Sequence, residues 1–257
     1  MTSDAEVPSA TDIWTGLRRL TAARIGLRRT GAALATREML DFQLAHARAR
    51  DAVHAPLDEA ALAADLAALD APVVTVASAA ADRQTYLLRP DLGRRLAPGA
   101  EAALAPFRGD HDIVFVVADG LSASAVQHHA TPLLSRILPA LRAESWNVAP
   151  LVIVRHGRVA TGDAVALALS TSCAAVLIGE RPGLSAPDSM GAYLTWQPRL
   201  ETSDAERNCI SNIRPDGINY DKAAFKLIHL LRAMRTHGLS GVALKDDSDR
   251  SLIGGGS

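Results

Sequence analysis

The sequence predicts an α/β protein: a Rossmann-like, doubly wound, mostly parallel sheet with a smaller, mostly helical N-terminal region. One observation is that apolar runs of strand length alternate with segments of helical periodicity. Another is that the runs at 151–154, 174–178 and 192–196 each lead into a loop rich in glycine, asparagine, serine and charge. Loops at the carboxyl edge of such a sheet carry ligand sites, so a ligand site is the first hypothesis.

Composition excludes several classes of protein. A chain of 257 residues with a formal net charge of −1 has room for a substantial core and no overall field that would attract nucleic acid or an anionic membrane. Its two cysteines, Cys173 and Cys209, are too few and too distant for a disulfide scaffold or a zinc site. No secretory signal opens the chain and no apolar run reaches about 18 residues. We therefore expect a cytoplasmic protein without a metal site.

Residues 1–35 are expected to form a flexible, basic N-terminal arm. Residues 1–11 are small and polar and predict disorder, and residues 13–20 predict a short amphipathic helix. The excess of arginine fits either an acidic partner surface or an ordinary solvated helix face. The basic residues within the first 50 positions are Arg18, Arg19, Arg24, Arg28, Arg29, Arg37, Arg48 and Arg50.

The region 36–109 is expected to be mostly helical and to end in a linker. Helical spacing begins at Thr36, a candidate N-cap, and stops before Pro56. A second helix at 57–69, a β-branched strand at 72–78 and a linker or lid at 82–96 follow. Proline and glycine cluster between 98 and 110, where we place the domain boundary.

The region 110–250 is predicted to be the ligand-binding domain. Residues 111–118 read as a central parallel strand, and a helix at 121–142, capped by Ser122 or Ser124, follows it. Pro132 and Pro139 are expected to kink or interrupt that helix. The last helix, 220–237, ends at Gly238 and leads to a final strand at 241–244. The glycine-rich tail at 254–257 is expected to be flexible.

The loop after the first strand of this domain lacks the common nucleotide motifs. Residues 119–124, Asp-Gly-Leu-Ser-Ala-Ser, supply neither the G-x-G-x-x-G pattern nor a P-loop. Asp119-Gly120 resembles the entry of alkaline-phosphatase-like hydrolases, which need further aspartate and histidine ligands. A metal-dependent phosphatase is therefore a minor alternative.

Four further residues, in three loops, have a structural interpretation beside a functional one. Glu180 and Arg181 form either an acid/base pair or an ion pair, and the two glycines and one proline around them favour backbone shaped to lie against something large and flat. Cys209 is a candidate nucleophile or a small buried filler. Val159 can equally be ordinary core packing.

Taken together, these loops identify a family. The strings FQLAHARARDAVH, VADGLSASAV, RHGRVATGD, VLIGERPGLSAPDSMGAYLTW, DAERNCISNIRPDGI and LSGVALKD resemble the small subunit of ethanolamine ammonia-lyase from about residue 36 to 245. The resemblance implies an adenosylcobalamin-dependent lyase that converts ethanolamine to acetaldehyde and ammonia, within a hetero-oligomer. A large barrel subunit would hold the substrate, and the small subunit would pack against the corrin. It also allows a location inside a bacterial microcompartment.

The resemblance implies that the cobalamin-binding residues are Val159, Glu180 and Cys209, with the catalytic residues on the large subunit. Many cobalamin-binding domains supply a histidine from an Asp-x-His-x-x-Gly loop, but here Leu121 stands at the histidine position. The cofactor is therefore expected to keep its own benzimidazole as the lower ligand. The alternative is a stand-alone corrinoid-binding carrier module without catalysis.

Overall fold

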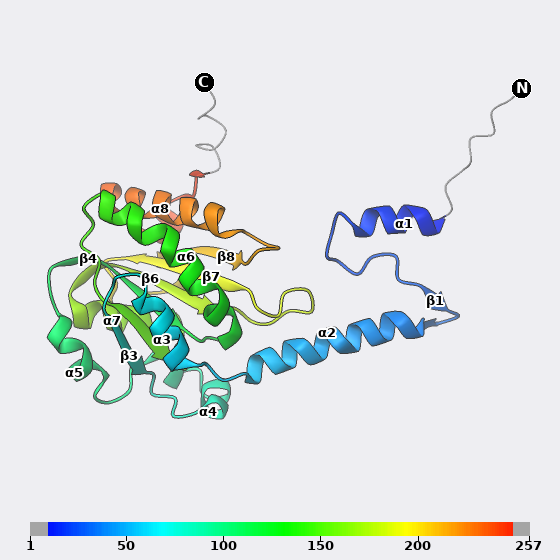
Figure 1. The fold of residues 1–257 in the computed structure, drawn as a ribbon, viewed down its shortest axis with the longest axis horizontal. Helices are drawn as coiled ribbons and strands as arrows, with labels where there is room; N and C mark the ends of the chain where they lie inside the picture. Colours follow the sequence, from blue (N-terminus) through cyan, green and yellow to red (C-terminus); the bar gives the residue numbers. More distant parts are fainter. Residues whose placement is uncertain (1–9, 249–257) are drawn as a thin grey trace, which may run out of the picture.

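A six-stranded sheet with the order β3-β5-β4-β6-β7-β8 organises the chain in the computed structural model, which describes residues 10–248 (Figure 1). Most of the predicted disordered start and all of the glycine-rich tail lie outside the described residues. The strands are β3 (Val73–Ala77), β4 (His111–Ala118), β5 (Leu151–Arg155), β6 (Thr171–Gly179), β7 (Met190–Trp196) and β8 (Arg207–Ile213).

The sheet has a parallel and an antiparallel half. The β3–β5, β5–β4 and β4–β6 pairs are parallel, whereas β7 pairs antiparallel with both β6 and β8. The predicted α/β fold with a mostly parallel sheet is confirmed. Strand β3 lies on the N-terminal side of the boundary predicted near residue 110, so the sheet includes a strand from both regions.

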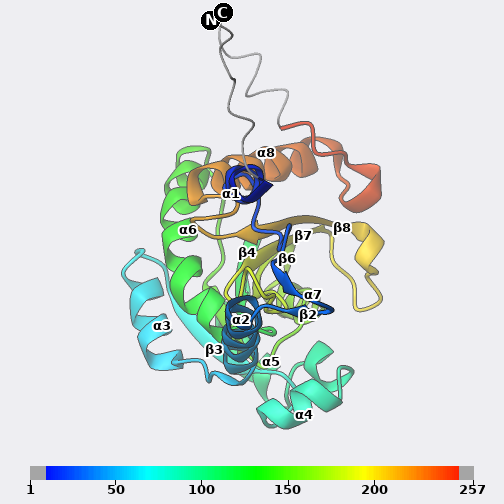
Figure 2. The same cartoon turned by 90° about the vertical axis from the view of Figure 1, so that its right-hand side faces the viewer.

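Helices cover both faces of the sheet (Figures 1 and 2). Helices α3 (Glu59–Ala67), α6 (Ala123–Ala143) and α8 (Tyr220–His237) pack on one face, and α5 (Ala100–Leu104) and α7 (Thr161–Leu169) pack on the other. Side chains of β4 alternate between the two cores: Phe115 and Val117 face the first, and Val114 and Val116 face the second. This burial on both faces explains why β4 is apolar along its length.

Two differences from the sequence predictions concern the C-terminal half of the chain. Pro132 and Pro139 do not interrupt α6: the helix continues through both prolines and buries ten of its side chains. Residues 241–244 are not a strand: Gly241–Ala243 forms the 3₁₀ helix η4, which starts at the left-handed Gly241 (φ 74°). The Asn208 side chain holds this turn by accepting from the Gly241 N–H at 2.7 Å.

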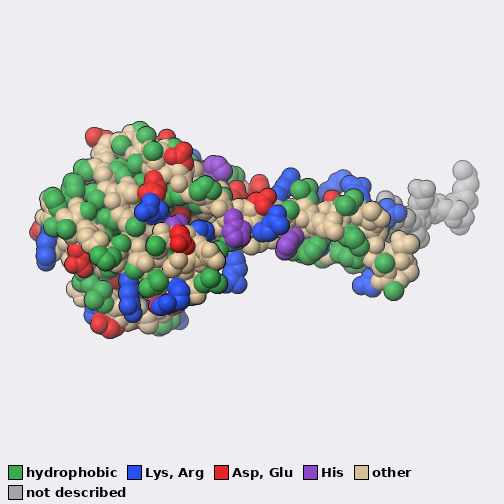
Figure 3. All heavy atoms as spheres, turned by 90° about the horizontal axis from the view of Figure 1, so that it is seen from below, with side chains coloured by type: hydrophobic (Ala, Val, Ile, Leu, Met, Phe, Trp, Pro, Cys, Tyr) green, Lys and Arg blue, Asp and Glu red, His purple; other side chains and the backbone are tan. Residues whose placement is uncertain are grey.

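The N-terminal arm projects from the body of the molecule (Figures 1 and 3). Helix α2 (Thr36–His54) has no buried residue and begins after Ala35, so Thr36 is its first residue rather than its cap. Beyond α2 lie α1 (Ala10–Arg18) and the short strands β1 (Arg29–Thr30) and β2 (Ala33–Leu34). The predicted linker holds α4 (Arg83–Leu88) and the 3₁₀ helix η1 (Leu92–Arg94), with η2 (Ala105–Phe107) and η3 (Asp204–Glu206) elsewhere. None of the described helices is long and apolar enough to cross a membrane.

Candidate functional site

The carboxyl ends of β4, β5 and β6 meet at one edge of the sheet. The chain leaves β4 towards α6 on one face and leaves β5 towards α7 on the other. The crevice between two such strands is where open α/β sheets bind ligands. Asp119 follows β4 and His156 follows β5, so these two residues lie at this crevice.

A hollow of about 460 Å³ lies at this edge and contains two of the three predicted residues, Val159 and Glu180. Val159 follows β5 and is half-buried against the second core, so its core-packing interpretation is also correct in part. The hollow is lined by Tyr86, Gly120, Leu121, Arg158, Val159, Ile178, Gly179, Glu180, Arg181 and Tyr193.

Two glycines bring backbone into close contact at the floor of the hollow. A Cβ on Gly179 would lie 2.0 Å from the Ser122 carbonyl oxygen and 2.6 Å from that of Asp119. Gly120 has φ 55°, and a Cβ there would lie 2.3 Å from the Gly179 oxygen. The Leu121 N–H donates to this same oxygen at 3.0 Å. Only glycine permits this approach, because the space that each Cβ would take is filled by backbone of the neighbouring strand end.

Glu180 joins the two halves of the sheet. One of its carboxylate oxygens accepts from the Asn212 N–H at 3.1 Å, where the β7–β8 register shifts between Met190 and Ala192. Asn212 is left-handed (φ 59°), so this bond holds a bulged segment of β8. A single hydrogen bond uses part of the capacity of a carboxylate, and the remaining lone pairs of Glu180 can accept from a ligand in the hollow.

Cys209 is adjacent to the site, because it pairs with Tyr193, which lines the hollow. The segment after the run at 192–196 was expected as a loop, but residues 207–212 belong to the edge strand β8, in which Cys209 pairs in register with Tyr193 of β7. Cys209 is exposed, so the buried-filler interpretation is wrong, and its Sγ lies 3.2 Å from the Ser211 Oγ. The Tyr193 side chain lines the hollow, and burial, followed by the neighbouring Cys209, raises its pKa. Tyr193 therefore presents a neutral phenol.

Asp119 is buried and lines the neighbouring hollow with His156, and its carboxylate is bonded to other residues of the protein. Its carboxylate accepts from the Gly157 N–H at 3.2 Å, lies 3.1 Å from the His156 Nδ1 and forms an ion pair with Arg83 at 3.7 Å. The phosphatase alternative requires Asp119 to join further metal ligands. Between residues 10 and 248, no group of three or more histidine, cysteine, aspartate or glutamate side chains is placed to hold a metal ion.

Sequence reasoning missed Tyr86 and Arg158. Tyr86 lies in the predicted linker and is 1% exposed, with the guanidinium of Arg83 at 4.9 Å and that of Arg158 at 4.5 Å from its ring centroid. Burial raises the pKa of Tyr86 to about 12. A signal was available for Arg158, which directly precedes Val159 in the RHGRV string. No local pattern indicates that α4 folds back on this loop.

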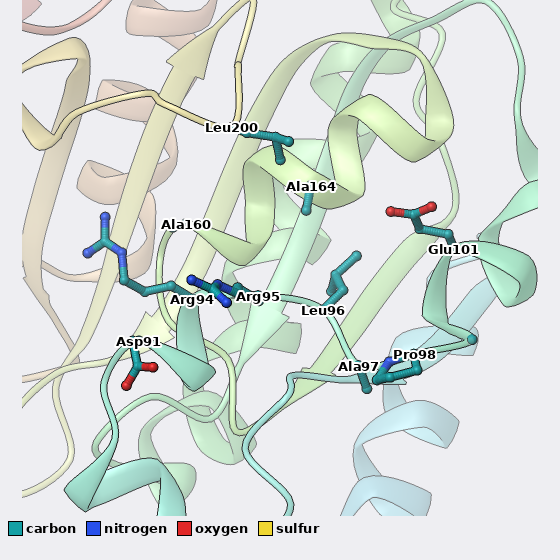
Figure 4. Close-up of a pocket in the computed structure, with 11 residues that line it drawn as sticks. Asp91, Arg94, Arg95, Leu96, Ala97, Pro98, Glu101, Ala160, Ala164 and Leu200 are labelled. Carbon is teal, nitrogen blue, oxygen red and sulfur yellow. The ribbon is translucent and has the colours of Figure 1, made fainter.

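A larger hollow, about 800 Å³, lies beside η1 and α5 (Figure 4). It is lined by Arg94, Arg95 and Leu200 among others, and it contains none of the predicted site residues. Ala160, the residue after Val159, belongs to this second hollow, so the two share the start of α7. Size alone therefore does not select the functional site.

Comparisons with known proteins give the family. The family model of the ethanolamine ammonia-lyase light chain matches residues 11–245. The chain is 50% identical to the ethanolamine ammonia-lyase small subunit of Azotobacter vinelandii, over 96% of this chain and 93% of that one. It is 49% identical to that of Pseudomonas aeruginosa (98% and 95%) and 51% identical to that of Ralstonia nicotianae (95% and 92%). The chain belongs to the family of ethanolamine ammonia-lyase small subunits.

Proposed function

We propose that this small subunit binds adenosylcobalamin at its interface with the large subunit of an ethanolamine ammonia-lyase, which converts ethanolamine to acetaldehyde and ammonia. One observation carries the proposal. Val159 and Glu180, two of the three residues that the resemblance implies, line one hollow, and the third, Cys209, is paired in register with the lining residue Tyr193.

The residues present suit a corrin. Gly120 and Gly179 line the hollow without side chains, so backbone forms this part of its surface, and a broad ring can lie against it. Glu180 offers acceptor capacity and Tyr193 a phenol, which match the carboxamide arms of a corrin. Val159 and Ile178 add apolar surface. A mixed lining of this kind is typical of cofactor sites.

The size of the hollow supports a second subunit. Pockets that enclose drug-sized ligands have volumes of about 300–1,000 Å³, and a corrinoid is larger than such ligands. A hollow of about 460 Å³ therefore covers only part of the cofactor. The rest requires another protein surface, which we assign to the large subunit.

The contribution of this chain is to bind, orient and shield. Bound adenosylcobalamin supplies a cobalt–carbon bond that breaks homolytically to give radicals. The Gly120–Gly179 floor fixes how closely this subunit approaches the cofactor, and Glu180 and Tyr193 fix its rotation. Val159 and Ile178 exclude water from this side. The residues that act on ethanolamine are assigned to the large subunit.

Reconstitution tests the proposal. Ethanolamine turnover should require this chain, its large subunit and adenosylcobalamin together, and a spectroscopic titration should show tight corrinoid binding only with both subunits. If this chain alone binds cobalamin as tightly as the pair and the pair has no turnover, the protein is a stand-alone carrier. If neither preparation binds cobalamin, the proposed site is wrong.

The lower ligand of cobalt is proposed to be the benzimidazole of the cofactor. Leu121 lines the hollow, and His156, which is hydrogen-bonded to Asp119, lines a neighbouring hollow with His54. No histidine is among the lining residues of the candidate site in the described part of the chain. Electron paramagnetic resonance of the reconstituted enzyme with ¹⁵N-histidine should show no change in the nitrogen splitting of cobalt. A changed splitting would refute the proposal.

The arm is proposed to contact the large subunit. The exposed large apolar side chains of residues 13–34 support this, because exposed apolar side chains gathered in one segment mark an interaction surface: Ile13, Trp14, Leu17, Leu20 and Leu34 are all more than a third exposed. Removal of residues 1–35 should weaken assembly with the large subunit in sedimentation and leave the thermal unfolding of the free chain unchanged. Full assembly of the truncated chain would contradict this.

A further inference from the structure

We propose that Arg158 is an additional cofactor-binding residue that recognises the phosphodiester of the nucleotide tail of cobalamin. The inference depends on the proposed function, because it names the part of the cofactor that one side chain contacts. It goes beyond Val159, Glu180 and Cys209, since all three are matched to the corrin itself.

Arg158 lies in a slot that fixes its guanidinium. Its backbone N–H donates to the Gly93 oxygen at 2.8 Å, and its Nη2 donates to the Tyr86 oxygen at 3.1 Å. A Cβ on Gly93 would lie 3.2 Å from the Arg158 Cγ, so the side chain passes close to this glycine. The guanidinium then stacks 4.5 Å from the centroid of the Tyr86 ring. A side chain held on three sides in this way loses little entropy when it binds a ligand.

The charge of Arg158 is unpaired. None of the described carboxylates forms a salt bridge with Arg158, although Arg83, which also contacts the Tyr86 ring, is paired with Asp119. The buried Nε of Arg158 has no hydrogen-bond acceptor among the described residues. A cation with most of its donors unused, at the wall of a hollow, favours an anionic ligand.

The charged lining residues of the hollow point to the same chemistry. Arg158 and Arg181 are cationic, and Glu180, the one carboxylate among the lining residues of the described chain, is already bonded to the Asn212 N–H. The carboxamides of a corrin are neutral, and its nucleotide tail carries a single phosphodiester anion. Because arginine binds phosphate oxygens through charge-assisted hydrogen bonds, we assign Arg158 to that group.

The test uses this chain assembled with its large subunit and two corrinoid probes, cobinamide and cobinamide phosphate, which differ only in the phosphate. The wild-type complex should bind cobinamide phosphate about tenfold or more tightly than cobinamide, as expected for a charge-assisted hydrogen bond. Arg158→Gln should abolish this preference. Arg95→Gln, which removes the same charge at the other hollow, should leave the preference intact (Figure 4).

The outcomes separate the inference from the proposed function. If Arg158→Gln retains the preference for cobinamide phosphate, or binds both probes more weakly by the same factor, the phosphate assignment is wrong while cobalamin binding stands. If the wild-type complex binds neither probe nor cobalamin, both fail. Should Arg158→Gln not assemble, Arg158→Lys is the second variant: it keeps the charge without the flat stacking surface, so it must retain part of the preference. A complete loss in a well-folded Lys variant would also overturn the assignment.

Discussion

The parallel and antiparallel halves of the sheet contribute to the candidate site in different ways. The parallel half supplies strand-end loops: Val159 follows β5, and Gly179 and Glu180 lie at the end of β6. The antiparallel half supplies side chains from within strands, with Tyr193 on β7 and Cys209 on β8. The site therefore depends on how the two halves are held in register.

Two contacts join the halves near the site. Arg207 of β8 forms a two-pronged ion pair with Asp163 of α7, at 2.7 and 2.6 Å, with both side chains almost completely buried. On the other side of the hollow, Glu180 accepts from the Asn212 N–H. Arg207 is two residues before Cys209, and Asp163 is four residues after Val159. The ion pair therefore fixes the position of Cys209 relative to Val159.

Breaking the buried ion pair should have the largest effect. Arg207→Met leaves Asp163 buried without its partner, which should lower the free energy of unfolding by about 3–5 kcal/mol in urea denaturation. The control is Arg136→Met, which breaks the Arg136–Asp221 surface pair and should cost no more than about 1 kcal/mol. Equal losses in the two variants would show that Arg207 does not join the halves.

The loss of stability in Arg207→Met should depend on pH in a defined direction. Burial raises the pKa of Asp163, and Arg207 opposes this rise. Without Arg207 the folded-state pKa rises further above its unfolded value, and such a group favours folding at low pH and loses that contribution as pH increases. The deficit of Arg207→Met should therefore shrink as the pH falls from neutrality towards about 4, the ordinary pKa of an aspartate in an unfolded chain. A deficit that grows on acidification would contradict the assignment of Asp163 as the uncompensated charge.

Filling the backbone contact at the floor of the site should have the second largest effect. Gly179→Ala places a Cβ against the Ser122 and Asp119 carbonyl oxygens, which are backbone atoms and cannot rotate away. We expect a loss of about 1–3 kcal/mol in thermal unfolding together with weaker cobalamin binding by the assembled complex. Gly183→Ala is the control in the following loop, since its Cβ would meet nothing closer than the Ala186 oxygen at 3.7 Å. If both variants lose the same stability and the same cobalamin binding, the backbone contact at Gly179 is not the cause.

The parallel half was predicted more completely from the sequence than the antiparallel half, where the run at 192–196 located β7 but β8 was missed. Continuous apolar runs bounded by glycine and charge located β4, β5 and β6, because a strand buried on both faces has no polar side chains to confuse the pattern. Strand β8 was expected as a loop, since its sequence is mostly polar and only Arg207, Ile210 and Ile213 are buried. An edge strand and a polar loop have similar compositions, and only the pairing with β7 distinguishes them.

The walls of the site depended on contacts between distant segments. Tyr86 is more than 70 positions from Arg158, and no periodicity links α4 to the loop after β5. The positions of Val159 and Glu180 were predictable because a parallel sheet aligns its carboxyl ends at one edge. Long-range packing of this kind leaves no local signal in the sequence.

Removing the Glu180 carboxylate should have a smaller effect. Glu180→Ala leaves the Asn212 N–H without its acceptor and should cost about 1 kcal/mol in urea denaturation. Glu180→Gln keeps an oxygen that can accept from Asn212, so most of the stability should return, while cobalamin binding by the complex changes with the lost charge. If Gln is as destabilising as Ala, the hydrogen bond to β8 is not what Glu180 contributes to folding.

The two cysteines test the comparison between the two halves of the sheet with the smallest expected effect. Cys173 in β6 is buried, which raises its pKa to about 12, whereas Cys209 on β8 is exposed. Because the thiolate is the reactive form, iodoacetamide should label one thiol in the native chain and the second only in denaturant. Cys209→Ser should change stability by less than about 0.5 kcal/mol. In the wild-type chain, iodoacetamide should label Cys209 less in the complex with the large subunit and cobalamin than in the free chain. Undiminished labelling there would mean that the antiparallel half faces away from the cofactor, and that the parallel half alone forms the site.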